Sequence, residues 1–344
     1  MLRTLLFLST LISGWAFADT RTVTDSSGRV VEVPATVERV YAAGPPASIV
    51  TYMLAPEVLT GWPRAHHAYE RPYIAEAYRD LPVTGRLTGR GSTANLELVI
   101  GLEPDLILDF GSIRSTYVSL ADRTQAQTGI PYLLIDGRFE NTPTALRLLG
   151  DIFGVSERAE ELAQYTENLF SELDAFLAEV PEEQRPRVYL ARGPEGLETG
   201  VAGSINTEII ERAGGRNVAD YGPELARQRN LVSMSIEEVL DLDPDIILTW
   251  DRQFYDQVYS NPLWAPVRAV QNKKVYFAPS APFGWIDRPP SINRLMGLKW
   301  LTGLFYPDRF QFDLETEVRN FYRLFYQVEV SDSDLAQLIA WSRY

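Results

Sequence analysis

The chain has 344 residues, of which 45% are hydrophobic and 23% are charged, and its formal net charge is −14. This length suggests about two domains, and the acidic excess argues against nucleic-acid binding because phosphates would be repelled. The chain has no Cys and only two His, His66 and His67. Disulfide scaffolds, thiol chemistry and multi-His zinc sites are therefore excluded.

Residues 1–18 have the pattern of a secretory signal peptide. Arg3 precedes an apolar stretch, and Ala16-Phe17-Ala18 forms an A-x-A cleavage site, so cleavage is expected before Asp19. The alternative, a membrane anchor, needs a longer apolar run of ~20 residues. The mature protein is therefore expected to be exported and soluble, in the periplasm.

The first part of the mature chain, residues 19–152, is expected to form an N-terminal α/β lobe. Alternating residues on both sides of Gly28 predict a β-hairpin over 22–33. Residues 39–43 predict a short strand, and residues 47–54 predict the helix that follows it.

An internal repeat relates residues 95–108 (NLELVIGLEPDLIL) to residues 235–248 (SIEEVLDLDPDIIL). Each copy predicts a short helix, a Pro-Asp turn and a buried parallel strand, because Pro cannot continue a helix and an apolar run suits a strand covered on both faces. The segments 39–41 and 187–189, both Arg-Val-Tyr, form a second matching pair. A chance match of a common unit is the alternative. Two copies of one unit predict two similar lobes, each a parallel sheet flanked by helices.

A long helix is predicted between the two copies. Residues 156–180 keep a helical apolar spacing without interior Gly or Pro, and Ser156 is a candidate N-cap. The fold class is therefore α/β, with two lobes joined by one long rigid helix within residues 153–185. A C-terminal α/β lobe is expected over 186–288, with strands at 188–191, 246–249 and 274–277. A helical extension is expected over 289–344, its last helix near 334–341.

This combination of signal peptide, duplicated unit and linking helix resembles the periplasmic substrate-binding proteins of ABC importers for iron–siderophore complexes and vitamin B12. Residues 203–218 (GSINTEIIERAGGRNV) resemble that family's second-lobe segment. The resemblance implies a monomeric binding protein without enzymatic activity or intrinsic cofactor, which carries its ligand in a cleft between the lobes. It also implies delivery to an ABC permease dimer in the inner membrane. A ferric (Fe3+) siderophore is the expected cargo; cobalamin, haem and a small nickel or cobalt chelate are the alternatives.

Candidate ligand-binding residues follow the predicted strands, because ligands of open α/β sheets bind beyond the carboxyl ends of strands. This rule selects Phe110, Arg192 and Trp250. In the B12-binding relatives, the loop that matches 282–288 carries pocket aromatics and an Arg, which implies roles for Trp285 and Arg288.

The segment 62–69 is the second candidate, because the matching segment of the family lines the cleft from the first lobe. Its candidate residues are Trp62, Arg64, His66, His67 and Tyr69. Imidazole suits Fe, Ni and Co, so His66 or His67 is a candidate metal ligand, and the alternative is a surface or packing histidine. Arg86, Arg90, Arg192, Arg252 and Arg288 are notable cations in an acidic chain. Arg86 and Arg288, by their loop positions, are candidates for binding anionic siderophore oxygens, whereas a solvated surface charge is the alternative for each.

Glu97 and Glu237 occupy equivalent places in the repeat, one in each lobe. In the family, acidic residues at these positions pair with Arg of the two permease subunits, so the resemblance implies a docking role. The alternative is a pair of ordinary solvent-facing helix glutamates.

Two other function classes remain alternatives at this stage. A secreted α/β hydrolase has little support, because no G-x-S-x-G elbow, P-loop or G-x-G-x-x-G after a strand is found. A receptor or sensor module that uses the same fold is the second alternative.

Overall fold

The structure is a computed structural model that describes residues 19–89 and 91–340. The predicted signal peptide, Arg90 and Trp341 lie outside the described residues. Within these two ranges, none of the helices combines the length and the apolar character that crossing a membrane requires.

The N-terminal lobe is built on a parallel sheet in the order β3-β4-β5. The predicted hairpin is confirmed, and its turn residue Ser26 donates a backbone hydrogen bond to the carbonyl of Leu134. The sequence-based prediction omits β5, although all five of its residues are buried. The strands are β1 (Thr20–Thr24), β2 (Val30–Pro34), β3 (Val40–Ala42), β4 (Leu106–Gly111) and β5 (Tyr132–Asp136). The helices are α1 (Pro45–Leu54), α2 (Leu96–Gly101), α3 (Ser115–Thr128) and α4 (Thr142–Phe153).

The C-terminal lobe contains a second parallel sheet, in the order β11-β10-β6-β8, and a small antiparallel pair, β7 and β9. The strands predicted at 188–191, 246–249 and 274–277 are confirmed. The strands are β6 (Arg187–Ala191), β7 (Glu198–Gly200), β8 (Arg216–Asn217), β9 (Leu231–Ser233), β10 (Ile246–Thr249) and β11 (Val275–Phe277). The helices are α6 (Glu208–Arg212), α7 (Pro223–Gln228), α8 (Ile236–Leu242), α9 (Arg252–Gln257) and α10 (Arg268–Gln271). Two lobes with parallel sheets and flanking helices confirm the predicted fold class.

The two copies of the repeat make the same contacts. The backbone N–H groups of Arg39 and Arg187 donate to the carboxylates of Asp105 and Asp245, each at 2.9 Å. The two Asp backbone N–H groups donate back to the two Arg carbonyls. The Arg guanidinium groups also bind the carbonyls at the ends of α2 and α8. Since these contacts join each helix–strand unit to the neighbouring strand, the repeat is structural and not a chance match.

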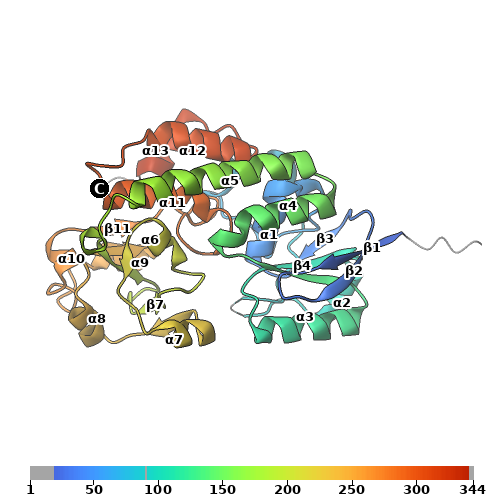
Figure 1. Cartoon of the computed structure of the whole chain (residues 1–344), viewed down its shortest axis with the longest axis horizontal. Coiled ribbons are helices and arrows are strands. Elements are labelled where there is room, and N and C mark those ends of the chain that lie inside the picture. Colours follow the sequence, from blue (N-terminus) through green and yellow to red (C-terminus); the bar gives the residue numbers. More distant parts are fainter. Residues whose placement is uncertain (1–18, 90, 341–344) are drawn as a thin grey trace, which may run out of the picture.

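Helix α5 (Ser156–Leu177) runs along one side of both lobes (Figure 1). Its N-cap residue is Val155, without a side-chain cap, so Ser156 stands one position inside the helix and its prediction as N-cap is wrong. The chain after the C-terminal lobe lies beside α5 as α11 (Arg294–Phe305), α12 (Leu314–Phe321), a π-helical turn (Tyr322–Tyr326) and α13 (Asp332–Ala340).

The C-terminal helices return to the N-terminal lobe. The hydroxyl of Tyr52 in α1 donates to the carbonyl of Tyr326, and the hydroxyl of Tyr73 donates to the carbonyl of Asp334 at 2.8 Å. Side chains of both lobes, α5 and these helices belong to one continuous hydrophobic core. The lobes are therefore joined by a shared core along the α5 side as well as by the long helix that the sequence predicts.

Candidate functional site

Arg294, the first residue of α11, joins the two lobes and is only 1% exposed. Its guanidinium donates to the carbonyl of Gly137, after β5, at 3.2 Å and to Glu208 Oε1 of α6 at 2.8 Å. Glu208 Oε1 also accepts the backbone N–H of Phe139 at 3.3 Å. Burial raises the pKa of Glu208, and the charge of Arg294 partly offsets this effect. The carboxyl edge of the first sheet therefore faces the second lobe.

A second contact joins the lobes at the side where α3 and α7 lie (Figure 1). Arg114, the N-cap residue of α3, donates from Nη1 to the carbonyl of Gln228 at the end of α7, at 2.8 Å. This hydrogen bond is exposed to solvent, whereas those of Arg294 to the carbonyls of Ile205 and Gly137 are buried.

Arg192 forms a fixed cation at the carboxyl end of β6. Its guanidinium carbon lies 5.1 Å from the ring centroid of Trp250, which follows β10. Glu198 Oε1 lies 3.6 Å from Nε, and Asp287 Oδ2 lies 3.6 Å from Nη1. These separations exceed hydrogen-bond distance, and Nε and Nη1 have no hydrogen-bond partner. Arg192 and Trp250, each predicted from the end of a strand, lie together because β6 and β10 are neighbours in the sheet.

Asp287 connects this cation to the loop after β11. Its carboxylate is 1% exposed and accepts hydrogen bonds from Asn206 Nδ2 at 3.0 Å and from the backbone N–H of Arg288 at 2.8 Å. Arg288 has a φ of 64°, a left-handed conformation that is uncommon for a residue with a Cβ. The buried carboxylate therefore fixes both Arg192 and the backbone that presents the exposed side chain of Arg288.

The two predicted loops, 62–69 and 282–288, lie against each other. The ring centroids of His66 and Phe283 are 6.3 Å apart. His67 and Tyr69 are exposed and stack with their rings 5.5 Å apart. Burial raises the pKa of Tyr69, while the charges of Arg64 and Arg288 act to lower it. The first loop thus contributes the exposed rings of His67 and Tyr69, and the second contributes the exposed cation Arg288, whose charge acts on Tyr69.

Glu70 holds the first of these loops in shape. Its carboxylate accepts two hydrogen bonds from the Arg64 guanidinium, at 2.6 and 2.8 Å, and one from the backbone N–H of His67 at 2.8 Å. Burial raises the pKa of Glu70, but the nearby His66 ring and the hydrogen bonds from Arg64 and His67 outweigh it and lower the pKa to about 2. The cation predicted at Arg64 is therefore already paired within its own loop.

Three aromatic residues predicted to bind ligand lie in the hydrophobic core. Trp285 is fully buried, and Trp62 and Phe110 are 2% and 1% exposed. The indole of Trp285 donates to the hydroxyl of Tyr322, and its backbone lies so close to Gly297 of α11 that a Cβ there would come within 1.9 Å of the Trp285 carbonyl. The sequence analysis expects these side chains at a ligand-binding surface, but all three are buried among other core residues. Their roles in ligand binding stay predictions.

The two histidines point to different surroundings. The His66 side chain is 3% exposed, and its Nδ1 lies 3.6 Å from Glu70 Oε2, whereas His67 is exposed. Within residues 19–89 and 91–340, no group of three or more His, Asp or Glu side chains could hold a metal ion. Metal ligation by His66 or His67 stays a prediction.

Arg86 belongs to a glycine-containing loop that is tied to the first sheet by a buried carboxylate. The Nε of Arg86 donates to the carbonyl of Gly91 at 3.0 Å. Thr88, two residues along, donates to Asp109 Oδ1 at 3.3 Å, and the hydroxyl of Tyr132 donates to Asp109 Oδ2 at 3.2 Å. Burial raises the pKa of Asp109 to about 6, although the hydrogen bonds from Tyr132 and Thr88 act to lower it.

We expect Asp109→Asn to remove a pH dependence of stability between about pH 4 and about pH 6. The pKa of Asp109 rises from 3.8 to about 6 on folding. The folded chain therefore binds this proton more tightly, so the free energy of unfolding rises as the pH falls through this window, by roughly 3 kcal/mol at most. Urea unfolding across the window measures the slope. Glu97→Gln, an exposed control, should keep the wild-type slope; an unchanged slope in Asp109→Asn would contradict the assignment.

The strand-end rule missed two cations, Arg114 and Arg138. Arg114 stands four residues beyond Phe110, the residue that the rule selects after β4. Arg138 follows β5, the strand that the prediction omits, and it is exposed beside the Arg294 contact. Recognising residues 132–136 as a buried strand would have found Arg138. Arg252, in contrast, forms a surface pair with Asp256 of its own helix.

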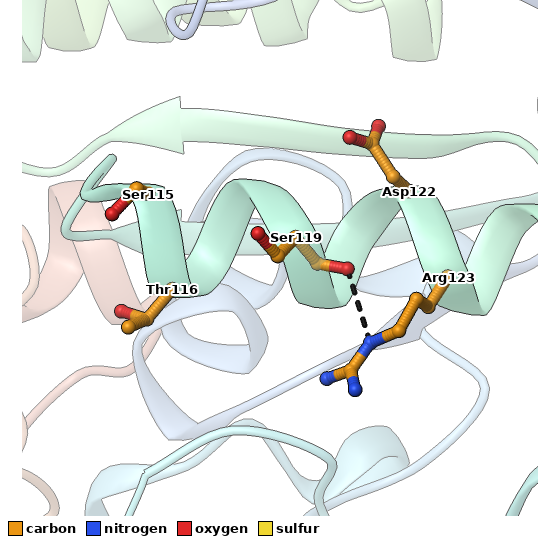
Figure 2. Close-up of a pocket in the computed structure, with 5 residues that line it drawn as sticks. All are labelled: Ser115, Thr116, Ser119, Asp122 and Arg123. Carbon is orange, nitrogen blue, oxygen red and sulfur yellow. Dashed lines mark hydrogen bonds between the residues drawn. The ribbon is translucent and has the colours of Figure 1, made fainter.

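Figure 2 shows a shallow hollow along α3. Its lining side chains come from this one helix, and Arg123 donates back to the carbonyl of Ser119 at 3.3 Å. A second cavity, of about 390 Å³, lies in the C-terminal lobe beside α8 and α9. The hollow and the cavity are each lined by residues of one lobe, so neither lies between the two lobes.

Comparisons with known proteins agree with this architecture. The sequence model of the periplasmic binding protein family matches residues 52–282. The molybdate-binding protein MolA of Haemophilus influenzae is 26% identical, over 96% of this chain and 99% of its own. A cobalamin-binding protein of Halobacterium salinarum is 30% identical over 59% of this chain and 52% of its own.

The solved structures that match have the same fold. An ABC transporter solute-binding protein from Sulfurospirillum deleyianum has a TM-score of 0.82 and 31% identity, and the match covers 93% of this chain and 99% of that one. MolA bound to molybdate has a TM-score of 0.74 and 23% identity, with 90% and 99% coverage. These relatives are solute-binding transport proteins and not enzymes, which excludes the hydrolase alternative. The chain, whose two α/β lobes are joined through Arg294, belongs to the periplasmic binding protein family of ABC transporters.

Proposed function

We propose that this protein captures an anionic, oxygen-rich ligand between its lobes and delivers it to an ABC permease. The proposal rests on the surroundings of the Arg192 side chain. Its guanidinium is held over Trp250, and Nε and Nη1 make no hydrogen bond although the carboxylates of Glu198 and Asp287 lie 3.6 Å away. A guanidinium has five N–H donors and suits carboxylate, catecholate or other oxyanion oxygens. Arg138 and Arg288 add cations beyond other strand ends, in a chain whose net charge is −14.

Molybdate is the first candidate ligand. The full-length similarity to a molybdate-binding protein supports it. The Arg294 and Arg114 contacts also support a small ligand, because they join the lobes at two places and so limit the width of the space between them. An anionic ferric siderophore offers the same oxygen chemistry and is the second candidate. The exposed stack of His67 and Tyr69 beside Arg288 favours it, since broad aromatic surface suits a bulky chelate.

Tryptophan fluorescence titration of residues 19–344 tests the ligand class. We expect saturable binding of molybdate, with sulfate as the control anion; saturation by a ferric catecholate siderophore alone would select the second candidate. Cobalamin, haemin and nickel–histidine complete the series. Trp250→Phe should lose most of the response, whereas Trp285→Phe, in the core, should keep it. Binding of cobalamin alone, with no response to either anion, would overturn the proposal.

The pair Glu97 and Glu237 is proposed to dock on the permease. Each residue is exposed in the first turn of its helix, α2 or α8. These helices lie in different lobes, on the side of the molecule opposite α5 (Figure 1). Two equivalent carboxylates suit the equivalent basic sites of a two-fold permease, where complementary charge steers association. Glu97→Ala/Glu237→Ala should therefore lose binding to the permease while keeping ligand affinity; unchanged permease binding would contradict docking by this pair.

A further inference from the structure

The cavity in the C-terminal lobe lies at the start of α8, the helix that carries the proposed docking residue Glu237. It has a volume of about 390 Å³ and includes Ile236, the first residue of α8 and the chain neighbour of Glu237. Phe254 and Trp264 form part of its apolar wall, and Leu263, at its rim, is 61% exposed. We use the name α8 groove for this cavity.

The α8 groove carries acidic charge beside its apolar wall. Glu195 lines it, and Glu237 and Glu238 stand in the first turn of the adjoining helix. Gln257 of α9 is polar and exposed within the lining. A complementary occupant is therefore apolar where it enters the groove and positively charged next to it.

The N-terminal lobe also has exposed apolar side chains beside a proposed docking carboxylate, here on the surface of a helix. On α2, Leu98 and Ile100 are 41% and 47% exposed, directly after Glu97, while Val99 between them is buried. Each helix of the repeat thus joins a proposed docking carboxylate to exposed apolar surface. Protein interfaces combine an apolar centre with a polar, charged rim in this way, and the apolar centre supplies most of the binding energy.

We propose that the α8 groove binds an apolar side chain located next to a basic residue on a periplasmic loop of the permease. The proposal rests on the docking role of Glu97 and Glu237 and extends it, because carboxylates at an exposed rim contribute mainly to association rate and orientation. Burial of an apolar side chain in the groove adds affinity that ionic screening does not weaken, since it is not a charge interaction.

Two matched variants test the groove. Leu263→Asp places a charge at its rim, and Val30→Asp makes the same change at a 69% exposed residue of the β1–β2 hairpin. Binding of each variant to the purified permease–ATPase complex of this protein in nanodiscs gives the dissociation constant. Leu263→Asp should weaken binding at least about 10-fold, the loss expected for one buried apolar side chain. Val30→Asp should bind like the wild type.

A third variant and the carboxylate double variant distinguish failure of the groove proposal from failure of the docking proposal. Gln257→Arg, which places a cation within the groove lining without removing an apolar group, should also weaken permease binding. Both groove variants should keep the ligand affinity and thermal unfolding temperature of the wild type. Wild-type permease binding by Leu263→Asp, with weakened binding by Glu97→Ala/Glu237→Ala, would overturn the groove and leave docking intact. If Leu263→Asp and Glu97→Ala/Glu237→Ala both bound the permease like the wild type, the groove proposal and the docking role of the carboxylates would both be wrong.

Discussion

Arg192→Gln is expected to weaken ligand binding by about 10- to 100-fold. Hydrogen bonds to a charged group contribute about 1.5–3 kcal/mol, and each 1.4 kcal/mol is a factor of ten. Gln cannot supply the positive charge or stack over Trp250 as the guanidinium does. Isothermal titration with molybdate, and with a ferric catecholate siderophore, measures the change. Arg192→Lys should be intermediate, because the charge remains but the planar fork of donors is lost.

Arg252→Gln is the matched control for this prediction. Arg252 also follows a strand of the second sheet, but its side chain is 67% exposed and is paired with Asp256. The same chemical change there should leave ligand affinity within about twofold, as expected for a surface pair. Equal losses in the two variants would indicate a general electrostatic effect, and no loss in Arg192→Gln would remove Arg192 from the site.

Arg294→Met is expected to lower the free energy of unfolding by about 3–5 kcal/mol, the typical loss when one partner of a buried ion pair is removed. The change leaves Glu208 and the carbonyls of Ile205 and Gly137 without their buried donor. Since Gly137 belongs to the first lobe and Glu208 to the second, the join between lobes is weakened as well. Urea unfolding measures the effect.

Arg147→Met provides the surface comparison. Arg147 pairs with Glu160 and Glu167, but its side chain is 38% exposed. Its loss should lower the free energy of unfolding far less than Arg294→Met does, because water solvates the carboxylates that remain. Adding Glu208→Gln to Arg294→Met should recover part of the stability by removing the unpaired buried charge. Similar losses for Arg294→Met and Arg147→Met would contradict the role assigned to the buried pair.

Local patterns predicted most of the architecture. The β1–β2 hairpin, the strands after both Pro-Asp turns and the long helix α5 depend on periodicity, turn residues and helix-breaking Pro, which act over a few neighbouring residues. The repeat also predicted that the two lobes would be alike, and Arg39 and Arg187 make matching contacts in them. Strand β5 was missed because a short apolar run can belong to either a strand or a helix.

The site was only partly predictable. The rule of strand ends identified Arg192 and Trp250, because parallel strands bring their carboxyl ends to one edge. It could not give the direction of each side chain: Phe110, which the rule also selected, is buried, and so are Trp285 and Trp62, which the resemblance implied. For the two Trp side chains, distant contacts with Tyr322 and with the carbonyl of Tyr78 decided the orientation.

The sequence by itself determined the two α/β units, the helix between them and the absence of thiol chemistry, and it predicted a signal peptide. Only the tertiary structure decided that the C-terminal helices join both lobes, that Asp287 fixes Arg192, and that Arg294 binds Glu208 across the lobes. The reason is physical. Secondary structure follows from interactions between near neighbours, whereas burial and pairing of a side chain depend on residues that folding alone brings close.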